Sequence, residues 1–382
     1  MKVNSFYLKA RDFLLKKMVA LTCAVALSTG AAWVHAEELK TAPPPFAVKV
    51  EIKPATAPQT SNTSAQKTAT QADSKAQPKA EKAVKKSTEK KIGVNIASRI
   101  LTLYEGDTKI KMYPVGVGRT STPTPTGFYK VQNKEVNPTW IDPDDTSIQI
   151  ASGPDNPIGY RWIGFHGNYG IHGTNNPGSI GGYVSNGCIR MKEPDVEDLY
   201  QYVSIGTPVT VYYDRLVIDV SPEHAVSYYV YPDGYGWQAL SVAQVKKALA
   251  GYGVEDFAEF KEISDKINRS DGNVTYVAKA YDLVVNGTKL SKRALGKNDQ
   301  IYLPSVAVAT ALDLDLRWNP QQGILTSPYG IAPGYVKSDV VYVNAANAYS
   351  LFHLNGSLTP DYVYNMYSVK GDKTPTVVIS RG

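Results

Sequence analysis

A cysteine and a histidine that lie sixteen residues apart have the side chains needed for nucleophilic catalysis. Cys188 stands in the run Ser-Asn-Gly-Cys-Ile-Arg-Met (185–191), and His172 stands in the run Ile-His-Gly-Thr (171–174). An imidazole within hydrogen-bond reach can take the thiol proton and later return it to the leaving group. Gly187 permits a tight turn that aims backbone N–H groups at developing negative charge. We therefore predict that Cys188 is a nucleophile, that His172 is its general base and acid, and that Gly187 belongs to an oxyanion hole.

A structural alternative exists for each of these residue types. Free cysteine often packs as a small buried apolar residue. Cys188, however, is the only cysteine outside an N-terminal signal-like segment that holds Cys23, and an exported chain with one unpaired thiol is unusual. We interpret His166, His224 and His353 as structural histidines. One cysteine and scattered histidines give no metal-ligand spacing, so we expect neither a metal nor another cofactor.

Polar residues on both sides of Cys188 are candidates for substrate binding. The guanidinium of Arg190 could bind a substrate carboxylate through two parallel hydrogen bonds. The alternative for Arg190 is an internal ion pair with Asp195 or Glu197. Ser185 and Asn186, which precede the Gly-Cys pair, are the other two candidates.

The residues that must position this site read as a compact, mainly antiparallel β-domain over 92–214. Alternating apolar residues and glycine or proline turns predict several short strands, and apolar residues at helical spacing predict one helix. The expected strands include 92–97, 99–104 and 109–118, and the expected helix covers about 194–203.

The rest of the chain contains two further regions. Residues 215–270 predict a helical connector, with one helix that Ser241 begins and Gly251 ends and a second helix over about 255–267. Residues 271–382 contain a weak repeat, in which Asp-Gln-Ile-Tyr-Leu-Pro (299–304) and Asp-Val-Val-Tyr-Val-Asn (339–344) each precede an apolar helix. Two copies are too few for a solenoid, so we predict a small α+β domain with pseudo-symmetry.

The N-terminal residues predict export. Residues 1–36 combine a basic stretch, an apolar run and small residues before Glu37, which is typical of a cleaved secretory signal. An uncleaved anchor is the less favoured alternative, because the run is short for a spanning helix. Residues 37–91 are rich in Ala, Lys and Pro and predict a disordered linker.

The positive charge of the whole chain is concentrated in these two segments. The chain carries a net charge of +6, of which residues 1–36 supply +4 and residues 37–91 supply +5. The remaining residues therefore carry −3, which gives no support for a nucleic-acid partner. The basic linker is either a plain spacer or a weak ligand for anionic polymers of the cell envelope.

Residues 171–174 and 185–191 together closely resemble the signature of the L,D-transpeptidases, the YkuD-type catalytic domain. The runs Thr-Pro-Thr-Pro-Thr-Gly-Phe (122–128) and Gly-Thr-Pro-Val-Thr-Val (206–211) are also similar to that family. The resemblance covers about 92–214 and implies a β-sandwich with one short helix, followed here by the helical connector and the α+β domain. One residue departs from the pattern, because the family most often has histidine where this chain has Asn186. Either His172 acts without a second histidine, or Asn186 shapes the pocket by hydrogen bonding.

The resemblance also implies the chemistry. Cys188 would attack a peptidoglycan stem peptide at its third residue, form a thioester and pass it to an amine of a neighbouring stem, which makes a 3→3 cross-link. The carbonyl of Gly173 would orient the His172 ring, and carbapenems would acylate Cys188. Such an acyltransferase would work in the periplasm or cell envelope.

Two other functions remain open from the sequence. A thiol L,D-carboxypeptidase or hydrolase would use the same residues but pass the acyl group to water. A wall-binding protein with a decayed catalytic site would use neither, and the intact pair of Cys188 and His172 argues against it. Residues 271–382 weakly resemble the copper amine oxidase N-terminal-like module, which is non-catalytic in that family and implies a wall-binding or spacer role without copper.

Overall fold

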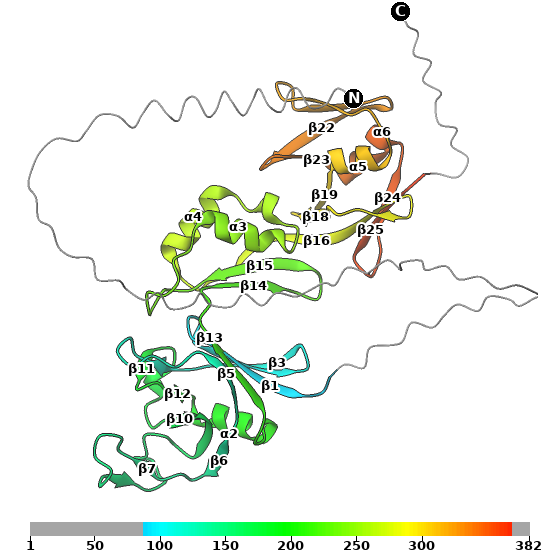
Figure 1. Ribbon diagram of the computed structural model, residues 1–382. Helices are drawn as coiled ribbons and strands as arrows, with labels where there is room; N and C mark the ends of the chain where they lie inside the picture. The colour runs from blue at the N-terminus through cyan, green and yellow to red at the C-terminus, as the bar shows by residue number, and fades with distance from the viewer. Residues whose placement is uncertain (1–86, 369–382) are drawn as a thin grey trace, which may run out of the picture. The chain divides into compact units, whose positions relative to one another are not determined.

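Residues 87–368 are described in the computed structural model of the chain (Figure 1). The predicted signal peptide (1–36), nearly all of the predicted linker (37–91) and residues 369–382 lie outside the described residues. Between residues 87 and 368, no helix is long and apolar enough to cross a membrane.

The first domain begins with a five-stranded sheet in the order β3-β2-β1-β13-β5. β1 runs parallel to β13, and the other neighbours are antiparallel. This agrees with the predicted β-domain, although its first strand starts two residues before the expected position. The strands of this sheet are β1 (Lys90–Asn95), β2 (Ile100–Glu105), β3 (Thr108–Pro114), β5 (Gly127–Lys130) and β13 (Pro208–Tyr212).

A second sheet of four strands, in the order β12-β10-β9-β6, carries the candidate catalytic residues. Its strands are β6 (Asn133–Val136), β9 (Arg161–His166), β10 (Tyr169–His172) and β12 (Ile189–Arg190). Two short pairs flank it, formed by β4 (Val117–Gly118) with β11 (Tyr183–Ser185) and by β7 (Trp140–Ile141) with β8 (Gln149–Ile150).

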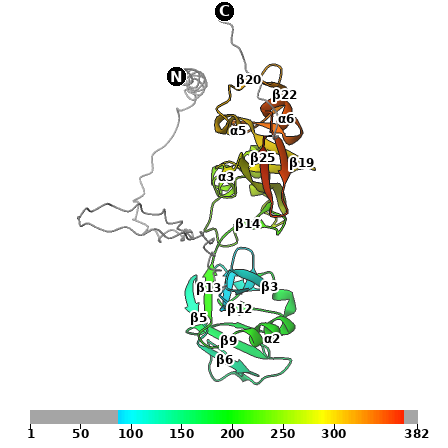
Figure 2. The same ribbon diagram turned by 90° about the vertical axis from the view of Figure 1, so that its right-hand side faces the viewer.

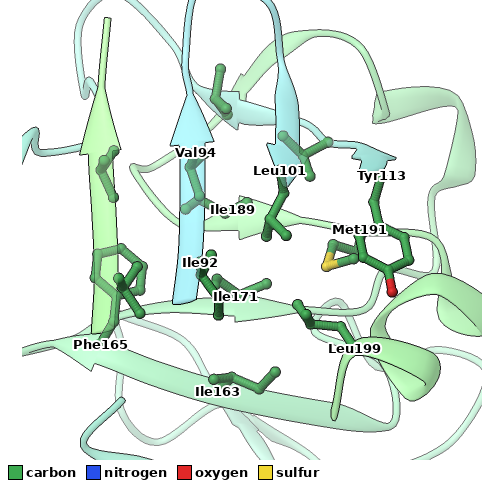
Figure 3. Packing of buried hydrophobic residues seen from close by; sticks show 14 of the residues in the cluster. Ile92, Val94, Leu101, Tyr113, Ile163, Phe165, Ile171, Ile189, Met191 and Leu199 are labelled. Atoms are coloured by element: carbon green, nitrogen blue, oxygen red, sulfur yellow. The ribbon is translucent and has the colours of Figure 1, made fainter. Parts of the chain in front are cut away.

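The two sheets pack face to face and enclose an apolar core (Figure 3). Ile92 and Leu101 from the first sheet meet Ile171 and Ile189 from the second, and all four are buried. The helix α2 (Glu193–Tyr202) packs against β9 and buries Val196 and Leu199 (Figure 2), and a 3₁₀ turn, η1, covers Pro177–Ser179. The predicted β-sandwich with a short helix is therefore confirmed.

Residues 215–270 contain the two expected helices and also two strands. α3 (Val242–Ala250) begins with a capping box at Ser241 and ends at Gly251, as predicted. The second helix is shorter than predicted, because a 3₁₀ turn, η2 (Glu255–Phe257), precedes α4 (Phe260–Arg269). The strands β14 (Leu216–Val220) and β15 (Ala225–Val230) pair with each other, and β15 pairs with a strand from beyond residue 270.

The remaining strands join β14 and β15 in one large sheet. Its main path is β14-β15-β16-β18-β19-β23-β22-β21-β20. The two halves of the predicted repeat lie side by side in it, since β19 and β23 pair antiparallel with Leu303 opposite Val343. The helices are α5 (Ser305–Ala311), η3 (Ala345–Asn347) and α6 (Ala348–Phe352). The strands are β16 (Thr275–Val285), β17 (Thr288–Lys289), β18 (Ala294–Lys297), β19 (Gln300–Pro304), β20 (Arg317–Asn319), β21 (Ile324–Ser327), β22 (Gly330–Lys337), β23 (Val340–Asn344), β24 (Asn355–Leu358) and β25 (Val363–Tyr367).

Candidate active site

Two neighbouring parallel strands position the candidate pair, since His172 ends β10 and Cys188 directly precedes β12. β10 pairs with β12 so that Ile171 lies opposite Ile189 and His172 lies opposite Arg190. The two isoleucines point into the core (Figure 3). Because side chains alternate along a strand, His172 and Arg190 stand on the outer face, and Cys188 directly precedes β12.

The His172 ring is fixed in one tautomer by the backbone carbonyl of the next residue. Its Nδ1 lies 2.6 Å from the carbonyl oxygen of Gly173. A carbonyl oxygen only accepts hydrogen bonds, so Nδ1 carries the proton and the lone pair of the neutral ring is on Nε2. Nε2 is therefore the atom of His172 that can accept a proton from a thiol.

Both members of the pair are uncharged at neutral pH. Burial, with a smaller contribution from the charge of Arg190, lowers the pKa of His172 from 6.5 to about 4, and the hydrogen bond to Gly173 opposes this shift. Burial raises the pKa of the Cys188 thiol, which a hydrogen bond with the Gly170 backbone and the charge of Arg190 partly offset. The thiol is partly exposed and donates to the carbonyl oxygen of Asn168 at 3.6 Å. The site thus holds a protonated thiol and a neutral base, both of which interact with the charge of Arg190.

Residues 185–188, here called the nucleophile loop, hold the thiol through the hydroxyl of Ser185. Ser185 Oγ accepts from the Gly187 N–H at 3.1 Å and donates to the Cys188 carbonyl oxygen at 2.5 Å. Ser185 was expected among the substrate-binding residues, but it is buried and both of these partners lie inside the loop. The N–H of Gly187 is likewise engaged, whereas within residues 87–368 the N–H of Cys188 has no acceptor.

Gly187 has a second reason to be glycine. Its φ of +113° disfavours other residues, and a Cβ at this position would lie 2.4 Å from the ring of Tyr169. The Tyr169 ring therefore packs directly on the backbone of the nucleophile loop.

Asn186 is exposed, and its side-chain oxygen accepts from Arg119 Nη2. The backbone N–H of Arg119 also donates to the Ser185 carbonyl oxygen at 3.0 Å. Sequence reasoning missed Arg119, since it lies 67 residues before Asn186 and no local pattern connects the two.

Arg190 forms no ion pair within the described residues. Its Nε is buried and has no hydrogen-bond partner in the described chain. The alternative ion pair with Asp195 or Glu197 is absent among the described residues, and Glu197 instead pairs with Arg161 at 3.2 Å.

An aromatic wall beside His172 was also missed. The Trp162 ring stacks on the His172 ring with centroids 5.7 Å apart, and its Nε1 donates to Asn133 Oδ1 at 3.0 Å. A Cβ on Gly170 would lie 2.5 Å from the Trp162 ring, so the indole lies flat over that backbone. Trp162 pairs with His172 across β9 and β10, and such a pairing could be found from sequence only with the strand register already known.

The other three histidines of this region of the chain do not join the pair. His166 is exposed and stacks on Tyr129 and Tyr169, with centroids 4.8 and 6.1 Å apart. His224 stacks on Tyr362 and His353 on Tyr329, both beyond the sandwich domain. No group of three or more His, Cys, Asp or Glu residues in the described part of the chain could hold a metal ion.

Comparison with known proteins identifies the family of this site. Residues 89–211 match the family model of the YkuD L,D-transpeptidase catalytic domain. A Bacillus licheniformis protein named as an L,D-transpeptidase, YkuD, is 40% identical over 122 residues, which are 32% of this chain and 64% of that protein. This chain thus spans less than two thirds of that relative. An NMR structure of the catalytic domain from an E. faecium L,D-transpeptidase covers 33% of this chain and 98% of its own, at 26% identity and a TM-score of 0.28.

A second relative matches over a larger share of its length. The Bacillus subtilis protein named as an L,D-transpeptidase, YqjB, is 41% identical over 126 residues, which are 31% of this chain and 69% of that protein. At this identity and coverage, the chain belongs to the YkuD family of L,D-transpeptidases.

Proposed function

We propose that this protein is a cysteine L,D-transpeptidase that forms 3→3 cross-links between peptidoglycan stem peptides. The observation that carries the proposal is that Cys188 directly precedes the strand that pairs with the strand of His172, whose lone pair is on Nε2. Family membership supports the substrate class.

The first half-reaction forms a thioester and releases D-Ala. His172 Nε2 takes the thiol proton as the sulfur of Cys188 attacks the carbonyl carbon of the third stem residue. The bond from that carbon to the D-Ala nitrogen then breaks, and His172 returns the proton to the leaving amine. An uncharged thiol and an uncharged imidazole suit this sequence, because the ion pair is needed only as the sulfur attacks.

The N–H of Cys188 is the best donor for the oxyanion. The resemblance implies that backbone N–H groups around Gly187 and Cys188 hold the oxyanion, and the Gly187 N–H is already hydrogen-bonded to Ser185 Oγ. The Cys188 N–H is free of such a partner in the described chain and belongs to the residue that is attacked. Gly187 contributes the backbone turn that exposes this N–H.

The second half-reaction decides between transfer and hydrolysis. An amine of a neighbouring stem attacks the thioester, its carbon–nitrogen bond forms, the carbon–sulfur bond breaks, and the amine proton returns through His172 to the sulfur. In this proposal the guanidinium of Arg190 binds a carboxylate of the donor or acceptor, which is supported by the lack of a hydrogen-bond partner for its Nε within the described residues. Water in place of the amine would give a carboxypeptidase.

The test is the muropeptide profile after the purified protein is added to tetrapeptide-rich peptidoglycan. New 3→3 dimers support transfer, tripeptides alone support the carboxypeptidase, and an unchanged profile overturns both. We expect Cys188→Ala to abolish the change and His172→Gln to slow it by at least about 100-fold. His224→Gln is the control, because His224 lies outside the sandwich domain and stacks on Tyr362, and it should retain activity.

We also propose that the chain is exported and that residues 271–382 bind the cell wall. A third proposal is that the basic linker contacts anionic envelope polymers. A pull-down of the full exported chain on purified sacculi, with and without residues 37–91, measures the contribution of the linker. Unchanged retention after that deletion would leave the linker as a plain spacer.

A further inference from the structure

The carboxylate of Glu193 is bound by two loops that surround His172. Glu193 Oε1 accepts from the N–H of Thr174 at 2.7 Å, and Oε2 accepts from the N–H of Tyr160 at 3.1 Å. These two donors lie 19 and 33 residues before Glu193 in the chain. Glu193 thus joins both loops to the first residue of α2.

The first of these hydrogen bonds reaches the peptide group that orients the catalytic histidine. The N–H of Thr174 and the carbonyl of Gly173 belong to one peptide unit. That carbonyl accepts from His172 Nδ1 at 2.6 Å, while the N–H of the same unit donates to Glu193. Successive hydrogen bonds polarise one another, so the carboxylate makes the Gly173 carbonyl a stronger acceptor.

Two glycines make this arrangement possible. A Cβ on Gly173 would lie 2.0 Å from Glu193 Oε1, and a Cβ on Gly159 would lie 1.8 Å from it. The carboxylate therefore sits in a space that side chains at either position would fill. Gly173 supplies the carbonyl for His172 and also the room for Glu193.

A general role at the start of a helix does not account for these contacts. An acidic residue in the first turn of a helix is stabilising through the helix dipole alone. Such a residue needs no partner outside its helix. In this chain both oxygens of Glu193 instead leave α2 and bind the backbones of two distant loops.

We propose that Glu193 is a positioning residue that acts on His172 through the Gly173–Thr174 peptide unit and supports its basicity. The inference rests on the proposed function, in which His172 is the base for Cys188. The arrangement is analogous to a catalytic triad of carboxylate, imidazole and nucleophile, except that one peptide group lies between the carboxylate and the imidazole.

Arg190 opposes this support. The positive charge of Arg190, on β12 opposite His172, disfavours the imidazolium. Cys188 is the other titratable group that interacts with Arg190. The negative charge of Glu193, relayed through the peptide, favours the imidazolium that forms as the thiol gives up its proton.

The test is the pH dependence of Cys188 alkylation by iodoacetamide in the full chain. At alkaline pH the thiol is ionised without help, so the rate there reports only access to the sulfur. At neutral pH the rate depends on the proton transfer to His172. We expect Glu193→Ala to lower the neutral rate about ten-fold relative to the alkaline rate, a factor typical of one lost hydrogen bond to a charged group. Glu193→Gln, which keeps the shape but not the charge, should fall between this variant and the original chain.

Glu197→Gln is the matched control, because Glu197 lies one turn later on α2 and pairs with Arg161 instead. Its ratio of neutral to alkaline rates should equal that of the original chain. The proposal is overturned if both Glu193 variants keep the original ratio, or if their neutral and alkaline rates fall together, which would indicate a deformed site. Because alkylation needs no peptidoglycan, a failed muropeptide experiment and a failed relay give different results.

Discussion

His172 and Arg190 lie directly opposite each other on the parallel strands β10 and β12. The charge of Arg190 lowers the pKa of the imidazole and also lowers the pKa of the Cys188 thiol. The same cation therefore makes the thiolate more accessible and the imidazolium less so. Burial is the larger cause of the lowered pKa of His172, and Arg190 adds to it, so the base is neutral over the whole physiological range.

The first prediction concerns the pH dependence of acylation. His172 is able to accept a proton only when it is neutral, which holds above its pKa of about 4. We therefore expect the rate at which a carbapenem acylates Cys188 to persist well below neutral pH and to decline as the pH approaches about 4. Mass spectrometry of the adduct at short times measures this rate. A decline centred near the ordinary histidine pKa would show that burial does not lower the pKa of His172.

The second prediction concerns the aromatic wall. In Gly170→Ala the new methyl group would meet the Trp162 ring, so the indole must move away from His172. We expect about 1–3 kcal/mol of lost stability, as for other overpacked sites, together with slower acylation of Cys188. Thermal unfolding and adduct formation measure the two effects.

Gly153→Ala provides the comparison, because a Cβ there meets nothing within 4 Å. It should leave both the unfolding temperature and the acylation rate close to those of the original chain. Equal unfolding temperatures and acylation rates in the two alanine variants would show that Trp162 does not contribute to the site.

The candidate nucleophile and its candidate base could be identified from sequence because each lies in a short, specific pattern. Cys188 and His172 each lie in a run whose glycines and neighbours are local. Glu193 could not be predicted, since it resembles any acidic residue at the start of a helix and its partners become visible only after the chain has folded. Arg119 was missed for the same reason.

The same division applies to the fold. Alternating residues identified the strands of the sandwich, and the repeat identified β19 and β23 as equivalent strands. Their direct pairing, and the addition of β14 and β15 to the sheet beyond residue 270, depend on strand register between distant segments. Local patterns do not encode that register.

The third prediction concerns Tyr235, which lies outside the residues that match the family model. Its ring is buried in the core of the sandwich. Its hydroxyl donates to the Gly118 carbonyl oxygen at 2.5 Å and accepts from the Thr124 N–H at 3.2 Å. Gly118 lies on β4, which pairs with the strand that enters the nucleophile loop. Tyr235 therefore supports the nucleophile loop indirectly, through β4 and β11.

We expect Tyr235→Phe to cost about 1–3 kcal/mol, because two buried backbone groups lose a partner. Chemical denaturation measures the loss, and acylation of Cys188 should slow with it. Tyr252→Phe serves as the reference, since the Tyr252 hydroxyl has no hydrogen bond within the described residues and the ring is exposed. A chain cut after residue 214 should lose more stability than Tyr235→Phe, and an unaffected truncated chain would contradict the role of this tyrosine.

The fourth prediction concerns Asn186, the residue that stands where the family most often has histidine. Asn186 accepts from Arg119, whose backbone also donates to Ser185, so the pair closes the exposed side of the nucleophile loop. Asn186→Ala and Arg119→Ala should each slow the acylation of Cys188 by less than about ten-fold, because the contact is exposed and Ser185 still holds the loop. Since both variants remove the same hydrogen bond, their effects should not add in the double variant. Additive effects in this cycle would mean that Asn186 acts on the substrate independently of Arg119.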